Sequence, residues 1–368
     1  MLQSCLVMIE NHFSEKMSRA TQMGLFALLF TINITFAQTP ADSSIAKQIK
    51  HGMQQTILND FSGASTTFQT IISQYPDKPF GYFYLGATLQ AEMLDQENYA
   101  KLDEFKALMK KTIELSRALQ KKNKNDPWAL FMEGSAHLYH GFMDSKTKKL
   151  WGAYRNAVKG TGRLVKAIEL DSTLYDAYLG VGSYRYWKSV KTKAIAWLPF
   201  LSDEREKGIR MVRTAIEKGQ FGRLVGKDQL AWILLHQKKY DEALELALEN
   251  HRLYPESRFF MWTLVEIYYK SESWKEAFQL YKKLLKIVRD LPDNNHYNEI
   301  TCLLRMAEIS CWKGDYKLAN ELTGEILRLE LNEDIRKRTK SKRKRAGELK
   351  KICTTELARA EQNIHSVK

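Results

Sequence analysis

The sequence predicts an all-α protein, a right-handed α–α superhelix (α-solenoid) of about seven helix pairs. Two observations predict this class. Apolar residues recur at intervals of three and four, whereas long β-branched alternation and Asn-Gly hairpin turns do not occur. Small and aromatic residues also repeat at a fixed offset, as between Ala243 and Ala277, which are 34 residues apart. The 368 residues therefore predict one elongated array rather than several separate domains.

An uncharged, mostly apolar run at residues 24–36 predicts a cleavable secretory signal peptide over residues 1–37. Its 13 residues are too few to cross a bilayer, which needs about 20. Thr35 and Ala37 supply small residues before a cleavage site. The run begins far into the chain, so Met17 and Met23 are alternative start residues. We expect an exported protein of the bacterial envelope, either periplasmic or associated with the outer membrane.

Residues 38–332 carry the helical repeat, most clearly in two central units. The repeated positions of the first of these are Leu230, Ala231, Leu234, Tyr240, Ala243, Ala247 and Pro255. Those of the second are Leu264, Val265, Tyr268, Trp274, Ala277 and Tyr281. This pattern resembles the tetratricopeptide repeat, in which small residues let two antiparallel helices approach and Pro ends the second helix. The resemblance implies a concave groove, lined by the first helix of each pair, that binds protein or peptide partners.

The second, third and fourth units depart from this pattern because each has about 50 residues. We expect insertions at residues 93–102, 141–153 and 190–202. We also expect Gly141 to end its helix early, since glycine is a poor helix former.

The positions implied by the resemblance to line the groove are strongly aromatic, with basic residues near the middle. The candidate groove residues are Trp128, Phe131, Tyr186, Trp187, Trp232, Trp262, Tyr269, Arg185 and Lys188. Aromatic anchors with cationic neighbours suit a peptide or an amphipathic helix. The alternative for each aromatic is that it only packs against the next repeat.

One helix face carries acidic and imidazole groups at the spacing of a weak metal-site candidate. Glu133, His137, His140 and Asp144 follow helical spacing, and such ligands suit zinc or iron. No second cluster matches it, so we expect no metal and no cofactor. Nucleotide-binding glycine loops and hydrolase motifs do not occur in the sequence either, which favours a protein that is not an enzyme.

The three cysteines that follow the signal peptide lie near the C-terminus. Cys302 and Cys311 are nine residues apart, which places them on opposite faces of one helix. Pairing of Cys353 with either one stays open, although free thiols are favoured.

The net charge of +14 is concentrated at the C-terminus, where residues 333–368 have 12 basic and 5 acidic residues. The run comprises Arg336, Lys337, Arg338, Lys340, Lys342, Arg343, Lys344 and Arg345. In an exported protein this run favours an anionic membrane surface or an acidic partner over nucleic acid. Its alternative is a solvated face or extended connector. Beyond it, an amphipathic helix is expected to cap the last repeat.

The favoured function is a non-catalytic scaffold or adaptor that binds a protein or peptide partner in its concave groove. The alternative is a receptor for a small ligand or glycan, with Trp187, Trp232 and Trp262 as stacking platforms.

Overall fold

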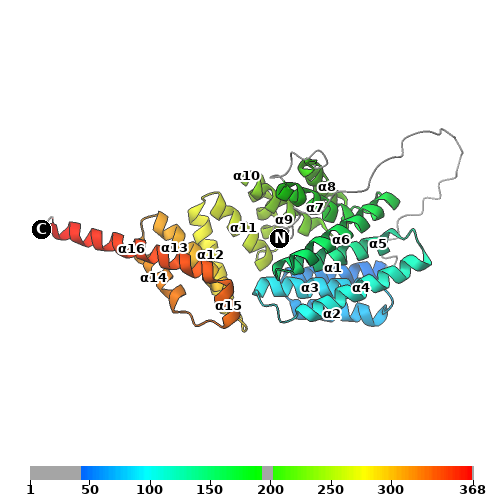
Figure 1. The fold of residues 1–368 in the computed structure, drawn as a ribbon, viewed down its shortest axis with the longest axis horizontal. Coiled ribbons are helices and arrows are strands. Elements are labelled where there is room, and N and C mark those ends of the chain that lie inside the picture. Colours follow the sequence, from blue (N-terminus) through cyan, green and yellow to red (C-terminus); the bar gives the residue numbers. More distant parts are fainter. Residues whose placement is uncertain (1–42, 193–201, 367–368) are drawn as a thin grey trace. The chain divides into compact units, whose positions relative to one another are not determined.

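The computed structural model describes residues 43–192 and 202–366, and every regular element in these ranges is a helix. The all-α prediction is therefore confirmed. In chain order the helices are α1 (Ser43–Ile57), α2 (Phe61–Gln74), α3 (Phe80–Gln96), α4 (Leu102–Lys122), α5 (Pro127–Lys146), α6 (Leu150–Leu170), α7 (Asp176–Thr192), α8 (Arg205–Lys218), α9 (Arg223–His236), α10 (Tyr240–Leu253), α11 (Arg258–Lys270), α12 (Trp274–Arg289), α13 (Tyr297–Trp312), α14 (Tyr316–Arg328), α15 (Glu333–Arg338) and α16 (Lys340–Ser366) (Figure 1). The predicted signal peptide lies outside the described residues.

Consecutive helices from α1 to α14 follow the order of the seven predicted pairs. Glycines allow close approach within two of them. A Cβ on Gly134 of α5 would lie 2.8 Å from the carbonyl oxygen of Gly160 of α6, and a Cβ on Gly160 would lie 2.7 Å from that of Gly134. Gly182 of α7 and Gly208 of α8 repeat the arrangement at 2.6 Å in both directions. Larger residues at these positions would push the two helices apart.

The expected insertion at residues 190–202 lies mostly outside the described residues. In the third unit, extra residues lengthen the helices themselves instead of forming the expected insertion at residues 141–153. α5 and α6 contain 20 and 21 residues, whereas α10 and α11 contain 14 and 13. The expected helix end at Gly141 is wrong, since α5 continues to Lys146. Gly141 lies where a Cβ would come within 3.0 Å of the Ala153 carbonyl oxygen, so close packing on α6 explains a glycine inside a helix.

The described chain forms two compact units. Unit 1 includes residues 63–87 and 106–229 with α5 to α8, and unit 2 includes residues 54–62, 88–105 and 230–366 with α10 to α16. Residues from the first third of the chain therefore belong to the core of the C-terminal unit. The boundary falls within α1, α2, α3, α4 and α9, which each continue from one unit into the other.

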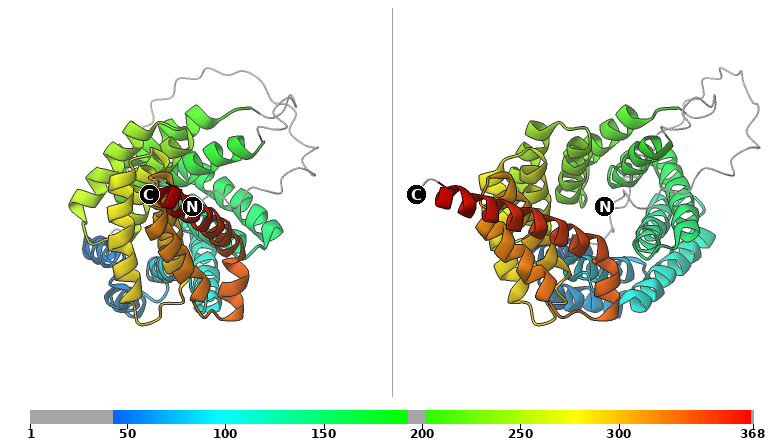
Figure 2. Two further views of the ribbon diagram at one scale, coloured as in Figure 1. Left: turned by 90° about the vertical axis from the view of Figure 1, so that its left-hand side faces the viewer. Right: turned by 60° about the vertical axis from the view of Figure 1, so that its left-hand side comes forward.

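The basic run forms α15 and the start of α16, and α16 packs against α13 and α14. Ala346, Leu349 and Cys353 form its buried line, each at most 1% exposed. The last turns of α16 extend past α13 and α14 (Figure 2). Through this contact α16 covers buried apolar residues of α14, such as Leu322 and Ile326.

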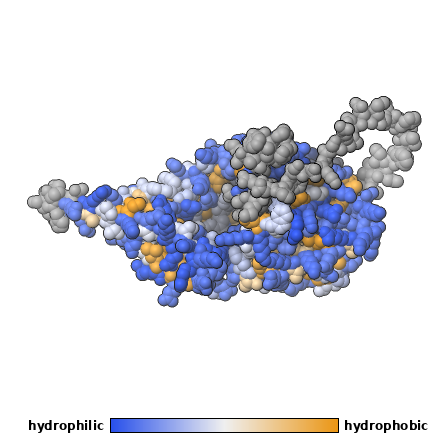
Figure 3. Space-filling view, viewed as in Figure 1, coloured by the Kyte–Doolittle hydropathy of each residue, from blue (hydrophilic) through white to orange (hydrophobic). Residues whose placement is uncertain are grey.

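The surface shown in Figure 3 is mostly hydrophilic, with apolar spots between hydrophilic residues. Among the helices of the described ranges, none combines the length and apolar character needed to cross a bilayer.

Candidate functional site

Trp128, a candidate groove aromatic of unit 1, is buried in contact with a corner of the same unit. Trp128 packs edge-on against Phe131, with ring centroids 5.4 Å apart. Phe221, from the corner between α8 and α9, lies 6.3 Å from the rings of both Trp128 and Tyr84. Lys50 adds its ammonium 5.9 Å from the Phe221 centroid. The chain's own Phe221 thus covers part of the ring surface of Trp128 and Tyr84.

Asp176 holds the Phe221 corner in place. Its carboxylate accepts backbone N–H bonds from Gln220, Phe221 and Gly222 at 3.0, 3.0 and 2.7 Å. Three successive amides on one buried carboxylate fix the backbone of a short turn. Phe221 is therefore positioned by the loop as well as by ring packing.

The remaining candidate residues of unit 1 also have partners inside the unit. Tyr186 and Trp187 pack edge-on at 5.0 Å and are 0% and 2% exposed. Arg185 pairs with Glu204, and Lys188 is half-buried. Burial of Trp187 removes one of the three proposed stacking platforms from solvent.

In unit 2 the two candidate tryptophans stay half-buried on successive first helices. Trp232 of α9 donates from Nε1 to Thr263 Oγ1 of α11 at 3.0 Å, so the two helices are direct neighbours. Trp262 precedes Glu266 by one helical turn, which places both on one face of α11. Trp232, Trp262 and Glu266 all retain solvent exposure.

Arg305 of α13 extends this face with a charged network. Its guanidinium lies 4.2 Å from the ring centroid of Tyr269, 3.0 Å from Glu308 and 4.0 Å from Glu266. The Tyr269 hydroxyl donates to Glu308 at 2.7 Å. Burial, followed by the bond to Glu308, raises the pKa of Tyr269, so the hydroxyl stays a donor at neutral pH.

From α16, Arg345 joins the same network, with Nε 3.3 Å from Glu308. Arg345 is 41% exposed and Arg305 is 28% exposed, so both guanidinium groups reach solvent. We call this surface the aromatic–arginine face. Its members are Trp232, Trp262, Glu266, Tyr269, Arg305, Glu308 and Arg345.

Half of the basic side chains in the run contact other residues of unit 2 instead of pointing into solvent. Arg343 donates to the carbonyl oxygens at the end of α14, and Arg338 and Arg345 pair with carboxylates. Lys342 donates to Thr301, and its burial lowers the pKa of the amine to about 8. The residues left exposed are Arg336, Lys337, Lys340 and Lys344. The run therefore lies on two helices, α15 and α16, with one side packed on unit 2 and the other side solvated, and it is not an extended connector.

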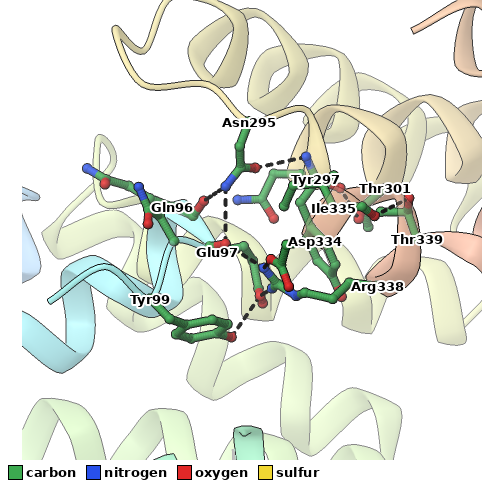
Figure 4. Close-up of polar contacts among 12 residues, drawn as sticks. Gln96, Glu97, Tyr99, Asn295, Tyr297, Thr301, Asp334, Ile335, Arg338 and Thr339 are labelled. Carbon is green, nitrogen blue, oxygen red and sulfur yellow. Dashed lines mark hydrogen bonds and ion pairs between the residues drawn. The ribbon is translucent and has the colours of Figure 1, made fainter. Parts of the chain in front are cut away.

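Arg338 also closes unit 2 on itself (Figure 4). Its guanidinium lies between the rings of Tyr99 and Tyr297, 4.7 and 4.6 Å from their centroids. It pairs with the Glu97 carboxylate and donates to the Glu97 carbonyl oxygen at 2.8 Å. Asn295 donates to the same carbonyl at 3.1 Å. Cations stacked between two aromatic rings and bonded to a carboxylate are held in one orientation.

Asp95 and Arg258 make a second closure beside the first. Arg258 binds the Asp95 carboxylate through Nε and Nη2, with a shortest distance of 2.6 Å. Its backbone N–H donates to Asn59, and Asn298 donates to the Asp95 carbonyl oxygen. We refer to Asp95, Glu97, Arg258, Asn295 and Arg338 as the clasp.

The weak metal candidate on α5 is engaged in structural contacts. Glu133, whose side chain is fully buried, binds Arg117 at 2.9 Å and Arg163 at 3.2 Å. Burial alone would raise the pKa of Glu133, but bonds from Gln120 and Arg117 and the nearby charges leave it lowered. His137 contacts Asn156 at 3.0 Å. Within residues 43–192 and 202–366, His, Cys, Asp and Glu nowhere form a group of three suited to a metal ion.

Asn156 links His137 to the last member of that candidate stripe. Its Nδ2 donates to Asp144 at 3.1 Å, and His140 lies 3.8 Å from the same carboxylate. Glu133, His137 and Asp144 are therefore directed to polar partners on neighbouring helices, and His140 lies closest to Asp144 of its own helix.

Sequence reasoning missed several residues of the face and of the closures. Glu266 follows Trp262 at i+4, and Arg305 and Glu308 form an i,i+3 pair, so the sequence did contain a signal for this network. The clasp and Phe221 have no comparable signal, because their partners lie far away in the sequence.

No protein-family model and no curated protein matches the sequence. Solved structures of tetratricopeptide proteins align with the chain at low identity. The tetratricopeptide protein TTC0263 of Thermus thermophilus is 14% identical, with a TM-score of 0.38 over 60% of this chain and 97% of that chain. The P58(IPK) tetratricopeptide domain is 13% identical, with a TM-score of 0.29 over 86% and 99%. Yeast Tom70 is 13% identical, with a TM-score of 0.32 over 87% and 84%.

Proposed function

We propose that this chain is a non-catalytic scaffold of tetratricopeptide type that binds a protein or peptide partner on the aromatic–arginine face. The observation that carries the proposal is the half-exposure of Trp232 and Trp262 on successive first helices. Arg305 lies 4.0 Å from Glu266, which follows Trp262 by one helical turn. Large aromatic and arginine side chains dominate the binding free energy of protein interfaces. Their neighbours on this face are charged groups that suit the polar rim of an interface.

The chemistry of the face favours a chain with an apolar anchor and flanking polar groups. Trp232 and Trp262 offer apolar area, while Arg305 and Arg345 offer donors that are already oriented by Glu308. Ordering these donors before binding reduces the entropy lost on association. A glycan receptor would need stacking platforms open to solvent, and the burial of Trp187 leaves two of the proposed three.

Site-specific photo-cross-linking tests this proposal. A photoreactive phenylalanine analogue replaces Trp262 in one variant and Trp151 in another. Trp151 is 65% exposed on α6 and is not part of the face, so it is the matched control. We expect a discrete cross-linked product from position 262 that disappears when Arg305→Ala is added. Equal products from both positions, or a product unaffected by Arg305→Ala, would contradict the proposal.

We also propose that the protein is exported, with the apolar run at residues 24–36 as the support. Mass spectrometry of the mature protein should then identify Gln38 as its first residue, and recovery of the protein from the cytoplasmic fraction with residues 24–36 retained would contradict export. In the envelope, the exposed cations Arg336, Lys337, Lys340 and Lys344 would be available for an anionic membrane surface. Binding to anionic but not neutral vesicles, lost when these four become Gln, is the expected result.

A further inference from the structure

A second group of aromatic rings lies at one end of the aromatic–arginine face. Trp274 begins α12 and Trp312 ends α13, and their ring centroids are 4.7 Å apart. The ring centroid of Tyr269, a member of the face, lies 5.7 Å from each of them. Trp312 is 51% exposed and Trp274 is half-buried, so the Trp274–Trp312 pair presents apolar ring surface to solvent.

The Trp274–Trp312 pair stands in line with the rest of the face. On α11, Tyr269 follows Trp262 by seven residues, which is about two helical turns or about 10.5 Å. On α13, Trp312 follows Arg305 by the same number of residues, so both lie on one side of that helix. Because Tyr269 lies against both rings of the pair, Trp262 and the pair are the two aromatic ends of one surface.

The solvent-facing charge between these two ends is positive. The carboxylates of Glu308 and Glu266 are 8% and 22% exposed, whereas Arg305, Arg345 and Lys270 are 28%, 41% and 50% exposed. The acidic side chains therefore lie beneath the basic side chains that they contact. A partner that covers this surface removes the basic groups from water, and carboxylates of its own would offset that cost of desolvation.

We propose that the aromatic–arginine face and the Trp274–Trp312 pair together bind one acidic amphipathic helix of a protein partner. The inference rests on the proposed function and specifies the chemistry of the partner. In a helix, residues i and i+7 lie on one side about 10.5 Å apart, and residues i+3 and i+4 lie between them on that side. Apolar side chains at i and i+7 contact Trp262 and Trp312, and carboxylates at i+3 and i+4 face Arg305 and Arg345.

Other peptide conformations match this surface less well. In an extended strand, side chains on one side are about 6.6 Å or about 13 Å apart, at offsets of two or four residues. A polyproline II segment places residues i and i+3 on one side about 9 Å apart, but the two residues between them point to other sides. A helix alone matches the spacing of the aromatic ends and also places carboxylates between its apolar anchors.

Fluorescence anisotropy with a synthetic probe tests this proposal on the full chain. The probe is a fluorescein-labelled, alanine-based helical peptide with Leu at positions i and i+7 and Glu at positions i+3 and i+4. We expect saturable binding that is at least about tenfold weaker for Trp262→Ala, Trp312→Ala and Arg305→Ala. Trp151→Ala, which changes an exposed tryptophan outside the face, should bind the probe with unchanged affinity.

Two matched peptides keep the test independent of any folding defect in the variants. In one, the second Leu moves from i+7 to i+9, which lies on the opposite side of the helix. In the other, both Glu residues become Lys. Each change should weaken binding to the unmodified chain at least about tenfold. Three results would overturn the proposal: no saturable binding of the first probe, equal binding of the three peptides, or unchanged affinity for Trp312→Ala.

Cross-linking from position 262 separates failure of this proposal from failure of the proposed function. A product that depends on Arg305, found together with a probe that does not bind, would overturn the acidic helix and leave the scaffold function standing. Absence of the product would contradict both. Mass spectrometry of the product should map the cross-link to an acidic segment with apolar residues seven apart, and a basic or proline-rich segment there would overturn the proposal.

Discussion

Two regions of the molecule bring distant residues together by different chemistry. In unit 1, Phe221 packs on the rings of Tyr84 and Trp128. In unit 2, Arg338 pairs with Glu97, 241 residues away in the sequence. Apolar burial stabilises through lost contact with water, whereas a buried ion pair offsets much of its attraction by desolvation. The contact that joins distant residues therefore contributes a different free energy of folding in each unit.

The comparison also explains why the binding face is proposed in unit 2. In unit 1, Phe221 packs on the rings of Trp128 and Tyr84. In unit 2, Arg338 of the clasp packs on the rings of Tyr99 and Tyr297, whereas Trp232 and Trp262 keep part of their surface exposed. The closure of unit 2 therefore uses other aromatic rings than those of the aromatic–arginine face.

Removing the Phe221 ring should have the largest effect on stability. Phe221→Ala leaves a cavity between Tyr84 and Trp128, and we expect the free energy of unfolding to fall by about 3 kcal/mol. Urea unfolding followed by circular dichroism measures it. Phe221→Leu, which keeps most of the volume, should lose less than about 1.5 kcal/mol. Equal losses in the two variants would show that ring packing does not close unit 1.

Breaking the clasp should lower the free energy of unfolding less than Phe221→Ala does. Glu97→Gln and Arg338→Met, alone and together, form a double-mutant cycle, for which we expect a coupling free energy of about 1–2 kcal/mol. Both side chains are at most 21% exposed, so solvent screens the pair only partly. The matched control is Arg359 with Glu356, an exposed pair on α16, whose coupling should stay below about 0.5 kcal/mol. Similar coupling in both cycles would contradict an ionic closure.

The buried carboxylate of Glu133 gives a smaller, pH-dependent effect in unit 1. Its pKa is lowered in the folded protein, so its contribution is present above the unfolded pKa of about 4.5 and is lost as pH falls through the folded pKa. Glu133→Gln should therefore destabilise by about 1 kcal/mol at pH 7 and by progressively less below pH 4. Unfolding measured from pH 7 to pH 3.5 checks this; a difference that does not change with pH would argue against the ion-pair network.

The sequence predicted the parts of the fold that depend on local pattern. Helical spacing and the offset between Ala243 and Ala277 lead to paired helices, and Gly134 and Gly182 lie at close helix contacts as the small-residue rule requires. The extended helix through Gly141 was missed because tertiary packing outweighed its intrinsic propensity.

The closures and most of the face could not be read from the sequence for a different reason. Phe221, Glu97 and Arg258 are ordinary residues in short corners, and their partners become neighbours only after many helices have stacked. The same stacking buries Trp187 and leaves Trp262 half-exposed, although both lie on first helices. The periodicity of the sequence predicts on which helix a side chain lies, but it does not predict whether a residue from a distant part of the chain covers that side chain.

Partner capture by Trp262→Ala, compared with Trp151→Ala, tests the central claim most directly. Truncating a half-buried tryptophan should change stability by less than about 1 kcal/mol, yet removing an interface anchor costs about 2 kcal/mol or more of binding. We expect the partner cross-linked from position 262 to bind at least about tenfold more weakly to Trp262→Ala and with unchanged affinity to Trp151→Ala. Unchanged affinity for Trp262→Ala would contradict the proposed role of the aromatic–arginine face.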